Sequence, residues 1–281
     1  MKKILISFAD SRYKESLEAI EANTKSFAFD ERYFLTERNS LTKQFWKKTK
    51  PWLYRRGYGY WSWKAPIIKE YINNLQEGDI LVWSDAGNYW NNKPEAVQTF
   101  HNYISLLSGE KDILAFYQKF NIGDWTKGDI LQVTGIYDDE IALGSPQCIA
   151  AMLFIKKTCS STKLINRWCE LSDIDKELIT DKRSTVPNKP NFKENRHDQA
   201  ILSALLQTYK NVIFMPESEV MVWDGNWERL KDKPIQVRRT THKGKKGKDK
   251  YLFALTKPWR YLLYLYFKYY RHYDFMWRYM G

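Results

Sequence analysis

Residues 56–87, RGYGYWSWKAPIIKEYINNLQEGDILVWSDAG, decide the fold class of this chain. After a glycine- and aromatic-rich loop, apolar residues recur at helical spacing over 67–75, and Pro66 suits a first helical turn. The run 80–83 is short, continuous and apolar, which is typical of a strand buried on both faces. Asp85 stands where that strand ends. Ligands of α/β sheets bind outside the carboxyl ends of the strands, so this carboxylate is a candidate for holding a metal–phosphate group.

Three short motifs add a family resemblance: GYGYWSWK at 57–64, DAG at 85–87 and RHDQ at 196–199. Together they resemble the nucleotide-sugar glycosyltransferases of bacterial capsule and lipopolysaccharide synthesis that adopt the GT-A fold. The resemblance implies an α/β, GT-A-like, Rossmann-type single domain with a mostly parallel central sheet. DAG is similar to a reduced DXD signature, which binds a divalent cation (Mn²⁺ or Mg²⁺) and the donor diphosphate. Asp85 is then the metal ligand, and Gly87 stands where a DXD has its second acid.

Composition limits the remaining possibilities. A chain of 281 residues can bury one sizeable core, or one domain plus an appendage. Three cysteines (Cys148, Cys159 and Cys169) lack a zinc or redox spacing, which favours a reducing, cytoplasmic compartment. No apolar stretch reaches the roughly 18 residues of a membrane-spanning helix, and 3–9 fits a first strand better than a signal peptide.

The positive charge is concentrated at the end of the chain. Residues 234–281 hold twelve Lys and Arg against two Asp, which is +10 of the total +12. We therefore predict a catalytic domain over 1–230 and a basic, aromatic, helical extension over 231–281. Basic, aromatic helices lie at anionic membrane surfaces, so we expect a peripheral protein at the inner face of the cell membrane. Packing on the domain ranks second among the interpretations of this extension, and nucleic-acid binding ranks third.

Hydrophobic periodicity and turn-forming residues predict the other helices and strands in chain order. The predicted strands are 3–9, 32–35, 80–83, 113–117, 148–155 and 211–215. The predicted helices are one that carries Leu17 and Ile20 on a single face, followed by 67–75, 96–107, 164–171 and 200–206. A polar turn is predicted at 88–93, and a lid or variable surface loop at 172–195.

The resemblance assigns a first group of residues to the nucleotide-sugar donor. The base and ribose would lie near the turn after the first strand, with Ser7, Asp10 and Arg12 as candidates. The alternative is that Asp10 caps a helix and Arg12 is a surface charge. The other donor candidates are Tyr60, Lys64, Ser84, Asp85, Gln147 and Arg196.

Lys64 and Gln147 have specific predicted roles. Lys64 opens a helix, where a cation beside free backbone amides favours a bound diphosphate. Gln147 could donate a hydrogen bond to a sugar hydroxyl. A WTK-type segment at 125–127 resembles a loop of the same family, which implies acceptor or donor-sugar contacts for Trp125 and Lys127. Gln199 of the RHDQ motif is assigned the same role. A capped helix start with Trp125 anchored in the core is the competing interpretation.

The RHDQ segment supplies the predicted catalytic residues, His197 and Asp198. Asp198 is the expected general base if the enzyme inverts configuration, and it positions the donor sugar if the enzyme retains it. His197 would bind metal or phosphate, and Arg196 would bind the diphosphate or a carboxylate. Helix capping alone is the simpler alternative for an aspartate at this position.

The sequence therefore predicts transfer of a hexose from a nucleotide sugar, with a UDP-sugar as the expected donor, to a surface polysaccharide or lipid-linked glycan. The alternative function is a non-catalytic, basic peripheral protein that binds nucleic acid or scaffolds an assembly. That alternative rests on the basic extension and leaves the DAG and RHDQ segments unexplained.

Overall fold

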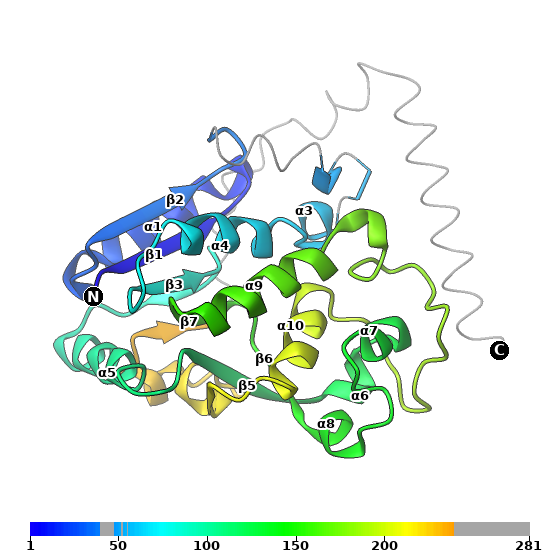
Figure 1. The fold of residues 1–281 in the computed structure, drawn as a ribbon. Coiled ribbons are helices and arrows are strands. Elements are labelled where there is room, and N and C mark those ends of the chain that lie inside the picture. Colours follow the sequence, from blue (N-terminus) through cyan, green and yellow to red (C-terminus); the bar gives the residue numbers. More distant parts are fainter. Residues whose placement is uncertain (40–47, 52, 55, 239–281) are drawn as a thin grey trace. The chain divides into compact units, whose positions relative to one another are not determined.

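The computed structural model describes residues 1–39, 48–51, 53–54 and 56–238 (Figure 1). Within them, a central sheet has the strand order β2-β1-β3-β7-β5-β6, and β8 also pairs with β5. Its strands are β1 (Lys3–Phe8), β2 (Glu31–Leu35), β3 (Ile80–Ser84), β5 (Ile113–Asn121), β6 (Pro146–Cys148), β7 (Met152–Lys156) and β8 (Val212–Met215).

Most strands of this sheet run in the same direction. β1 pairs in parallel with both β2 and β3, and β5 pairs in parallel with β8. β7 is antiparallel to β3 and to β5, and β6 is antiparallel to β5, so five of the seven strands share one direction. The predicted α/β class with a mostly parallel central sheet is confirmed.

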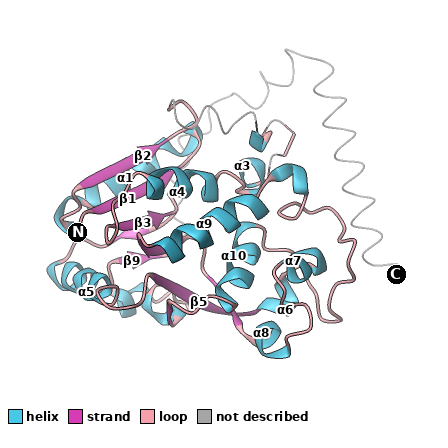
Figure 2. Ribbon diagram, viewed as in Figure 1, coloured by secondary structure: helices cyan, strands magenta, loops and turns pink. Residues whose placement is uncertain are grey.

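Helices cover both faces of the sheet (Figures 1 and 2). The longer ones are α1 (Lys14–Asn23), α4 (Lys64–Asn73), α5 (Pro94–Ser105), α9 (Cys159–Leu171) and α10 (Asp198–Gln207), and the shorter ones are α3 (Gly57–Tyr60), α6 (Ile122–Trp125), α7 (Gly128–Val133) and α8 (Glu140–Gly144). Leu81 and Trp83 pack with α4, α9 and α10, whereas Ile80 and Val82 pack with α5 on the other face. Alternate residues of β3 thus enter two different cores, as predicted for a strand buried on both sides.

Two predicted elements differ from the structure. The apolar run 148–155 spans parts of two strands, β6 and β7, which are separated by a short segment with Ile149 and Ala150 buried. β6 pairs with β5, whereas β7 pairs with both β3 and β5. Burial of the connection made the run look continuous. The predicted polar turn at 88–93 contains a short strand, β4 (Tyr89–Trp90), which pairs with β9 (Ile235–Gln236) and buries Trp90.

Strand β9 shows that part of the predicted extension belongs to the folded unit, since Ile235 and Val237 are buried in its core. The rest of the basic, aromatic segment, from residue 239 onward, lies outside the described residues, and so does its predicted membrane contact. In the part of the chain that the structure describes, no helix combines the length and the apolar character needed to cross a membrane.

Candidate active site

Two acidic residues far apart in the sequence meet at one buried lysine. The Lys64 Nζ lies 3.1 Å from Asp85 Oδ1 and 2.8 Å from Asp198 Oδ2, and it donates a hydrogen bond of 3.0 Å to the carbonyl of Ala150. Lys64 is 2% exposed, whereas the Asp85 side chain is 30% exposed. We call these three charged residues the carboxylate–lysine cluster. Its net charge is −1 when all three are ionised, and Asp85 is the member most open to solvent.

The surrounding elements hold each carboxylate in place. Asp85 follows β3, donates its backbone N–H to the carbonyl of Ala151 at 2.8 Å, and accepts a 2.9 Å hydrogen bond from Trp83 Nε1 at Oδ1. Asp198 is the first residue of α10, and Trp168 Nε1 of α9 donates to its carbonyl at 3.2 Å. The carboxylate therefore stands at a helix N-terminus, where the helix dipole favours negative charge.

Burial and charge shift the ionisation of this cluster. Burial raises the pKa of the Asp198 carboxyl above its ordinary value of 3.8, while the Lys64 charge opposes that shift. Burial acts to lower the pKa of Lys64, but the charges of Asp198 and Asp85 outweigh it and hold this pKa above its ordinary value. Lys64 thus stays a cation that holds two carboxylates. Its ammonium faces these carboxylates in the interior, and the diphosphate contact of Lys64 stays a prediction.

Asp85 could ligate a divalent cation that also binds the phosphates of a substrate. Among the described residues, no three ligating side chains gather into a metal site. Mg²⁺-type ions, however, use as few as one or two carboxylates when substrate phosphates supply further oxygens. The partly exposed Asp85 and the −1 charge of the cluster fit a cation that arrives with a diphosphate, although the nearby Lys64 ammonium disfavours one held by the protein alone.

A left-handed turn precedes Lys64. Five consecutive residues from Gly57 to Trp61 have φ between 54° and 96°, and the N–H of Trp61 donates to the carbonyl of Gly57 at 3.1 Å. Left-handed backbone costs about 1–2 kcal/mol for each non-glycine residue, so this turn is strained. Both glycines are needed for space as well, because a Cβ on Gly57 would lie 2.3 Å from the Trp61 ring and one on Gly59 would lie 2.7 Å from the Thr49 carbonyl oxygen.

A second polar cluster ties this turn to the loop before α10. Asp181 accepts a hydrogen bond from the Tyr60 hydroxyl at 2.9 Å and pairs with Arg56 at 3.2 Å, and Arg56 also pairs with Glu194 at 2.6 Å. Tyr60 is thereby held by Asp181 in the described structure. These contacts join residues more than 100 positions apart, and they fix the 172–195 loop against the turn.

His197 links the two clusters along the chain. Its Nδ1 lies 2.8 Å from the carbonyl of Ile179 and donates to it, which leaves Nε2 as an acceptor 3.7 Å from Asp181 Oδ1. Its ring stacks on Trp61, with centroids 5.4 Å apart, and its own φ is 56°. Burial lowers the pKa of His197 to about 4, so the ring is neutral at pH 7. A neutral, buried ring favours a positioning role over the predicted catalytic one.

The residues predicted near the base and ribose lie at the end of β1. Ser7 is fully buried, and its hydroxyl has no hydrogen-bond partner within the described residues. Asp10 accepts from the backbone N–H of Arg12 at 3.0 Å and pairs with its guanidinium at 2.8 Å. Asp10 therefore caps the short helix Ser11–Tyr13, which is the alternative weighed from the sequence, while Arg12 remains largely exposed.

Three other predicted site residues are engaged in the protein interior. The buried Ser84 hydroxyl accepts from Trp90 Nε1 at 3.1 Å, and Gln147 donates to the carbonyl of Trp125 at 3.1 Å and accepts from Gln199 at 2.8 Å. Ser84 and Gln147 are 0% exposed, so neither presents its side chain to a sugar. For these two residues the predicted donor contact is corrected to a structural role, and Gln199 is committed to Gln147.

In the WTK segment, Lys127 is buried and Trp125 is partly exposed. Lys127 is buried and donates to the carbonyl of Glu177 at 2.6 Å, and burial lowers its pKa to about 8. This position corrects its predicted sugar contact. Trp125 is half-buried, and the Arg196 guanidinium lies 4.2 Å from its ring centroid, so these two predicted residues do lie together.

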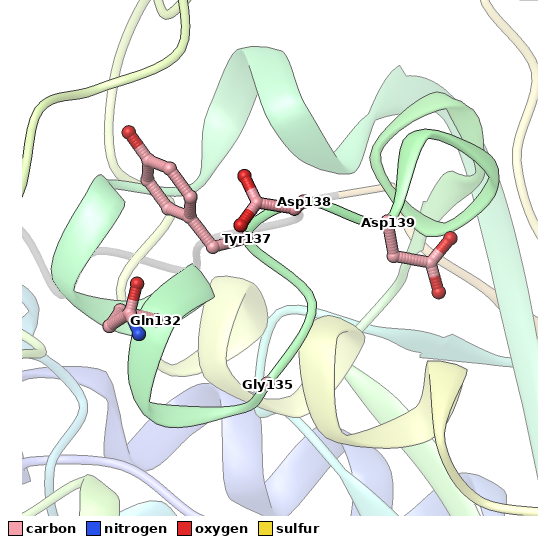
Figure 3. Close-up of a pocket in the computed structure, with 5 residues that line it drawn as sticks. All are labelled: Gln132, Gly135, Tyr137, Asp138 and Asp139. Atoms are coloured by element: carbon pink, nitrogen blue, oxygen red, sulfur yellow. The ribbon is translucent and has the colours of Figure 1, made fainter.

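A shallow hollow of about 280 Å³ lies elsewhere, between α7 and α8 (Figure 3). It is lined by Gln132, Gly135, Tyr137, Asp138 and Asp139. None of these residues belongs to the carboxylate–lysine cluster.

Sequence reasoning missed Arg56 and Asp181. Arg56 stood at the edge of the recognised motif, and Asp181 lay in a polar stretch without periodicity. The one signal was that a cation beside the glycine-rich turn needs an anion when it is partly buried. The sequence did not indicate which of the acids at 173–194 would supply it.

No family model and no curated protein matches the sequence. Among solved structures, the chain is similar to a glycosyltransferase involved in glycosylation of the major capsid of PBCV-1 (12% identity, 84% of this chain and 94% of that chain, TM-score 0.44). It is also similar to mouse xyloside xylosyltransferase 1 (6% identity, 83% and 93% covered, TM-score 0.45) and to the galactosyltransferase LgtC in complex with donor and acceptor sugar analogs (13% identity, 83% and 86% covered, TM-score 0.40). At these identities and TM-scores the likeness assigns neither an activity nor residue roles to this chain.

Proposed function

We propose that this chain is a glycosyltransferase that moves a hexose from a nucleotide-sugar donor, most simply a UDP-sugar, to a glycan acceptor. One observation carries the proposal: Asp85 at the end of a central strand and Asp198 at a helix start both contact the Lys64 ammonium. A buried ion pair between Lys64 and Asp198, with a second carboxylate from a distant segment, is unusual in a protein core, because desolvating the two buried charges opposes folding. Such clusters of perturbed groups concentrate at functional sites.

In this proposal Asp198 receives the proton. The acceptor hydroxyl oxygen bonds to the anomeric carbon, its proton passes to the Asp198 carboxylate, and the bond from that carbon to the diphosphate oxygen breaks. The raised pKa of Asp198 makes its carboxylate a stronger base than an exposed aspartate. This assignment applies to an inverting reaction; in a retaining one Asp198 positions the donor sugar.

Lys64 and Asp85 have supporting roles in the same proposal. Lys64 keeps Asp198 ionised and fixed in position until the acceptor arrives. A divalent cation, if bound, would be held by Asp85 and would neutralise charge on the leaving diphosphate. Tyr60 positions the 57–61 turn beside Lys64 through its hydrogen bond to Asp181, and His197 does so through its ring stacking on Trp61.

Nucleotide binding tests the proposal most cheaply. We expect at least one nucleoside diphosphate, with UDP as the first choice, to raise the melting temperature of the full chain, with a larger shift when Mn²⁺ is present. In Asp85→Asn the Mn²⁺-dependent part of the shift should disappear, whereas Asp138→Asn, at an exposed site, should behave as the wild type. Stabilisation by oligonucleotides alone would contradict the proposal and support the non-catalytic, nucleic-acid-binding alternative.

The basic segment suggests where the acceptor is met. We extend the proposal to a peripheral enzyme of surface-polysaccharide or lipid-linked glycan synthesis, with residues 243–281 on an anionic membrane surface, because their cations and aromatic residues suit such a surface. At low salt the full chain should bind phosphatidylglycerol vesicles, whereas a chain ending at 242 should not bind them and should still bind nucleotide. Equal vesicle binding by both chains would refute the membrane role without affecting the transferase assignment.

A further inference from the structure

A row of aromatic rings interleaved with cations lies on the surface next to the RHDQ segment. Its members come from the end of β5, from α6, from the loop before α10 and from the segment after the short helix Glu217–Glu219. We call it the aromatic–cation ridge, and its members are Lys119, Phe120, Trp125, Lys193, Arg196 and Trp223.

The rings of the ridge contact one another in sequence. Phe120 lies between two tryptophans, with its centroid 5.0 Å from that of Trp125 and 5.8 Å from that of Trp223. Trp223 is 51% exposed, which is unusual for the largest apolar side chain. Aromatic surface left open in this way marks a binding site more often than a solitary exposed residue does.

Cations lie over the faces of these rings. The Lys119 Nζ is 4.1 Å from the Trp223 centroid, the Arg196 guanidinium is 4.2 Å from that of Trp125, and the Lys193 Nζ is 5.6 Å from the latter. Asp124 pairs with Lys193 at 3.0 Å. Glu217 accepts a hydrogen bond from the Lys119 backbone N–H at 3.2 Å. Counted over these residues, three cations and two carboxylates give a net charge of about +1, so the ridge attracts an anionic ligand.

The ridge is joined to the carboxylate–lysine cluster through the backbone. The N–H of Arg196 donates to the carbonyl of Trp125 at 3.1 Å, and Asp198 follows Arg196 by two residues. A chain lying on the ridge is therefore held by the same segment that positions Asp198.

We propose that the aromatic–cation ridge binds the acceptor and that this acceptor is an acidic oligosaccharide, one with carboxylate or phosphodiester groups. The inference rests on the proposed function and names its substrate class. Sugar C–H groups pack against the electron-rich faces of aromatic rings, and the interleaved cations pair with the anionic groups. Neither the rings alone nor the cations alone would select this ligand.

The ring angles favour a glycan over single-stranded nucleic acid. Stacked bases need aromatic faces that can lie roughly parallel to successive bases. Here the Phe120 and Trp223 planes are 80° apart, and those of Phe120 and Trp125 are 49° apart. Sugar rings rotate relative to one another about their glycosidic bonds, so successive residues can meet rings at such angles.

Binding to short probes tests the proposal with the full-length chain. The probes are a hyaluronan hexasaccharide, a phosphodiester-linked oligosaccharide, the neutral maltohexaose and the oligonucleotide dT10, titrated by calorimetry at 50 mM and 150 mM salt. We expect at least one acidic glycan to bind at least fivefold more tightly than maltohexaose and dT10. Trp223→Ala and Lys119→Gln should each weaken that binding at least fivefold. Lys189→Gln should not, although Lys189 lies equally close, at 4.1 Å, over the Tyr137 ring outside the ridge.

Several results would overturn the proposal: no binding of either acidic glycan, equal binding of maltohexaose, tighter binding of dT10, or an equal loss in Lys189→Gln. Both ridge residues tested are exposed, and unchanged melting temperatures of the variants would show that they fold. UDP-induced shifts of the melting temperature, measured in the same variants, distinguish failure of the ridge proposal from failure of the transferase proposal. If the ridge proposal alone fails, nucleotide binding persists; if the transferase proposal fails, no variant binds nucleotide, whatever the ridge binds.

Discussion

Replacing Lys64 with methionine removes the buried cation while keeping a side chain of similar length. In the wild type its ammonium lies 2.8 Å from Asp198 and 3.1 Å from Asp85. At an effective dielectric constant of about 20, each contact is worth about 5–6 kcal/mol of Coulomb energy, which the desolvation of the charges largely offsets. Removing one partner of a buried pair typically destabilises a protein by about 3–5 kcal/mol, because the remaining charge is left buried. We expect that loss at pH 7.

The loss should also depend on pH in a defined direction. Without Lys64, the folded-state pKa of Asp198 rises further above 3.8, while the unfolded chain keeps its ordinary value. A carboxyl with a raised folded-state pKa stabilises the fold below its unfolded pKa, and that stability is lost as pH rises through the folded pKa. The gap between Lys64→Met and wild type should therefore narrow from pH 7 to pH 5.

Urea unfolding followed by circular dichroism measures these differences. The double variant Lys64→Met/Asp198→Asn should recover much of the loss, because it no longer buries an unpaired charge. Lys14→Met is the matched control: it breaks an exposed pair with Glu18 at 3.0 Å and should change the free energy of unfolding by about 0.5 kcal/mol or less. A Lys64→Met variant within about 1 kcal/mol of wild type at pH 7, with no pH dependence, would refute this reasoning.

Two further predictions concern the strained segments. The folded-state pKa of His197 is about 4, against an ordinary value of 6.5, so the free energy of unfolding should fall by about 3 kcal/mol as pH falls from 6.5 to 4. In His197→Phe this part of the pH dependence should disappear from the urea-unfolding data. An NMR titration of the His197 ring with a midpoint near 6.5 would contradict the prediction. Gly59→Ala should destabilise the fold by about 2–4 kcal/mol through its positive φ and the approach of its Cβ to the Thr49 carbonyl, whereas Gly78→Ala, with φ of 87° and open space around it, should lose only about 1 kcal/mol in the same urea assay. Equal losses at the two glycines would show that the turn tolerates a Cβ at position 59.

Local patterns were sufficient for most of the elements. Helical spacing predicted α4, α5, α9 and α10, and a continuous apolar run predicted β3, because burial leaves its pattern in the sequence. The apolar run of β8 also predicted a strand, although its residues are half-buried or exposed. The prediction of one strand over 148–155 was wrong because the connection between β6 and β7 is also buried and therefore has the apolar composition of a strand. Apolarity reports burial but does not report where the chain reverses.

The candidate site could be predicted only in part. Asp85 and Asp198 were both assigned to the active site, and the structure brings both to Lys64. The depth of Lys64, the internal hydrogen bonds of Gln147 and the pairing of Arg56 with Asp181 depend on contacts between distant segments. No local pattern records such contacts, so these roles could not be predicted from the sequence.

Turnover of a nucleotide sugar by Asp198→Asn tests the central claim most directly. Release of nucleoside diphosphate from a panel of nucleotide-hexose donors, in the presence of acceptor glycans, should be detectable for the wild type and about 10²–10⁴-fold slower for Asp198→Asn, with circular dichroism unchanged. Asp138→Asn, which alters an exposed carboxylate, should retain wild-type turnover. Equal turnover by Asp198→Asn and wild type would contradict the claim that sugar transfer takes place at the carboxylate–lysine cluster.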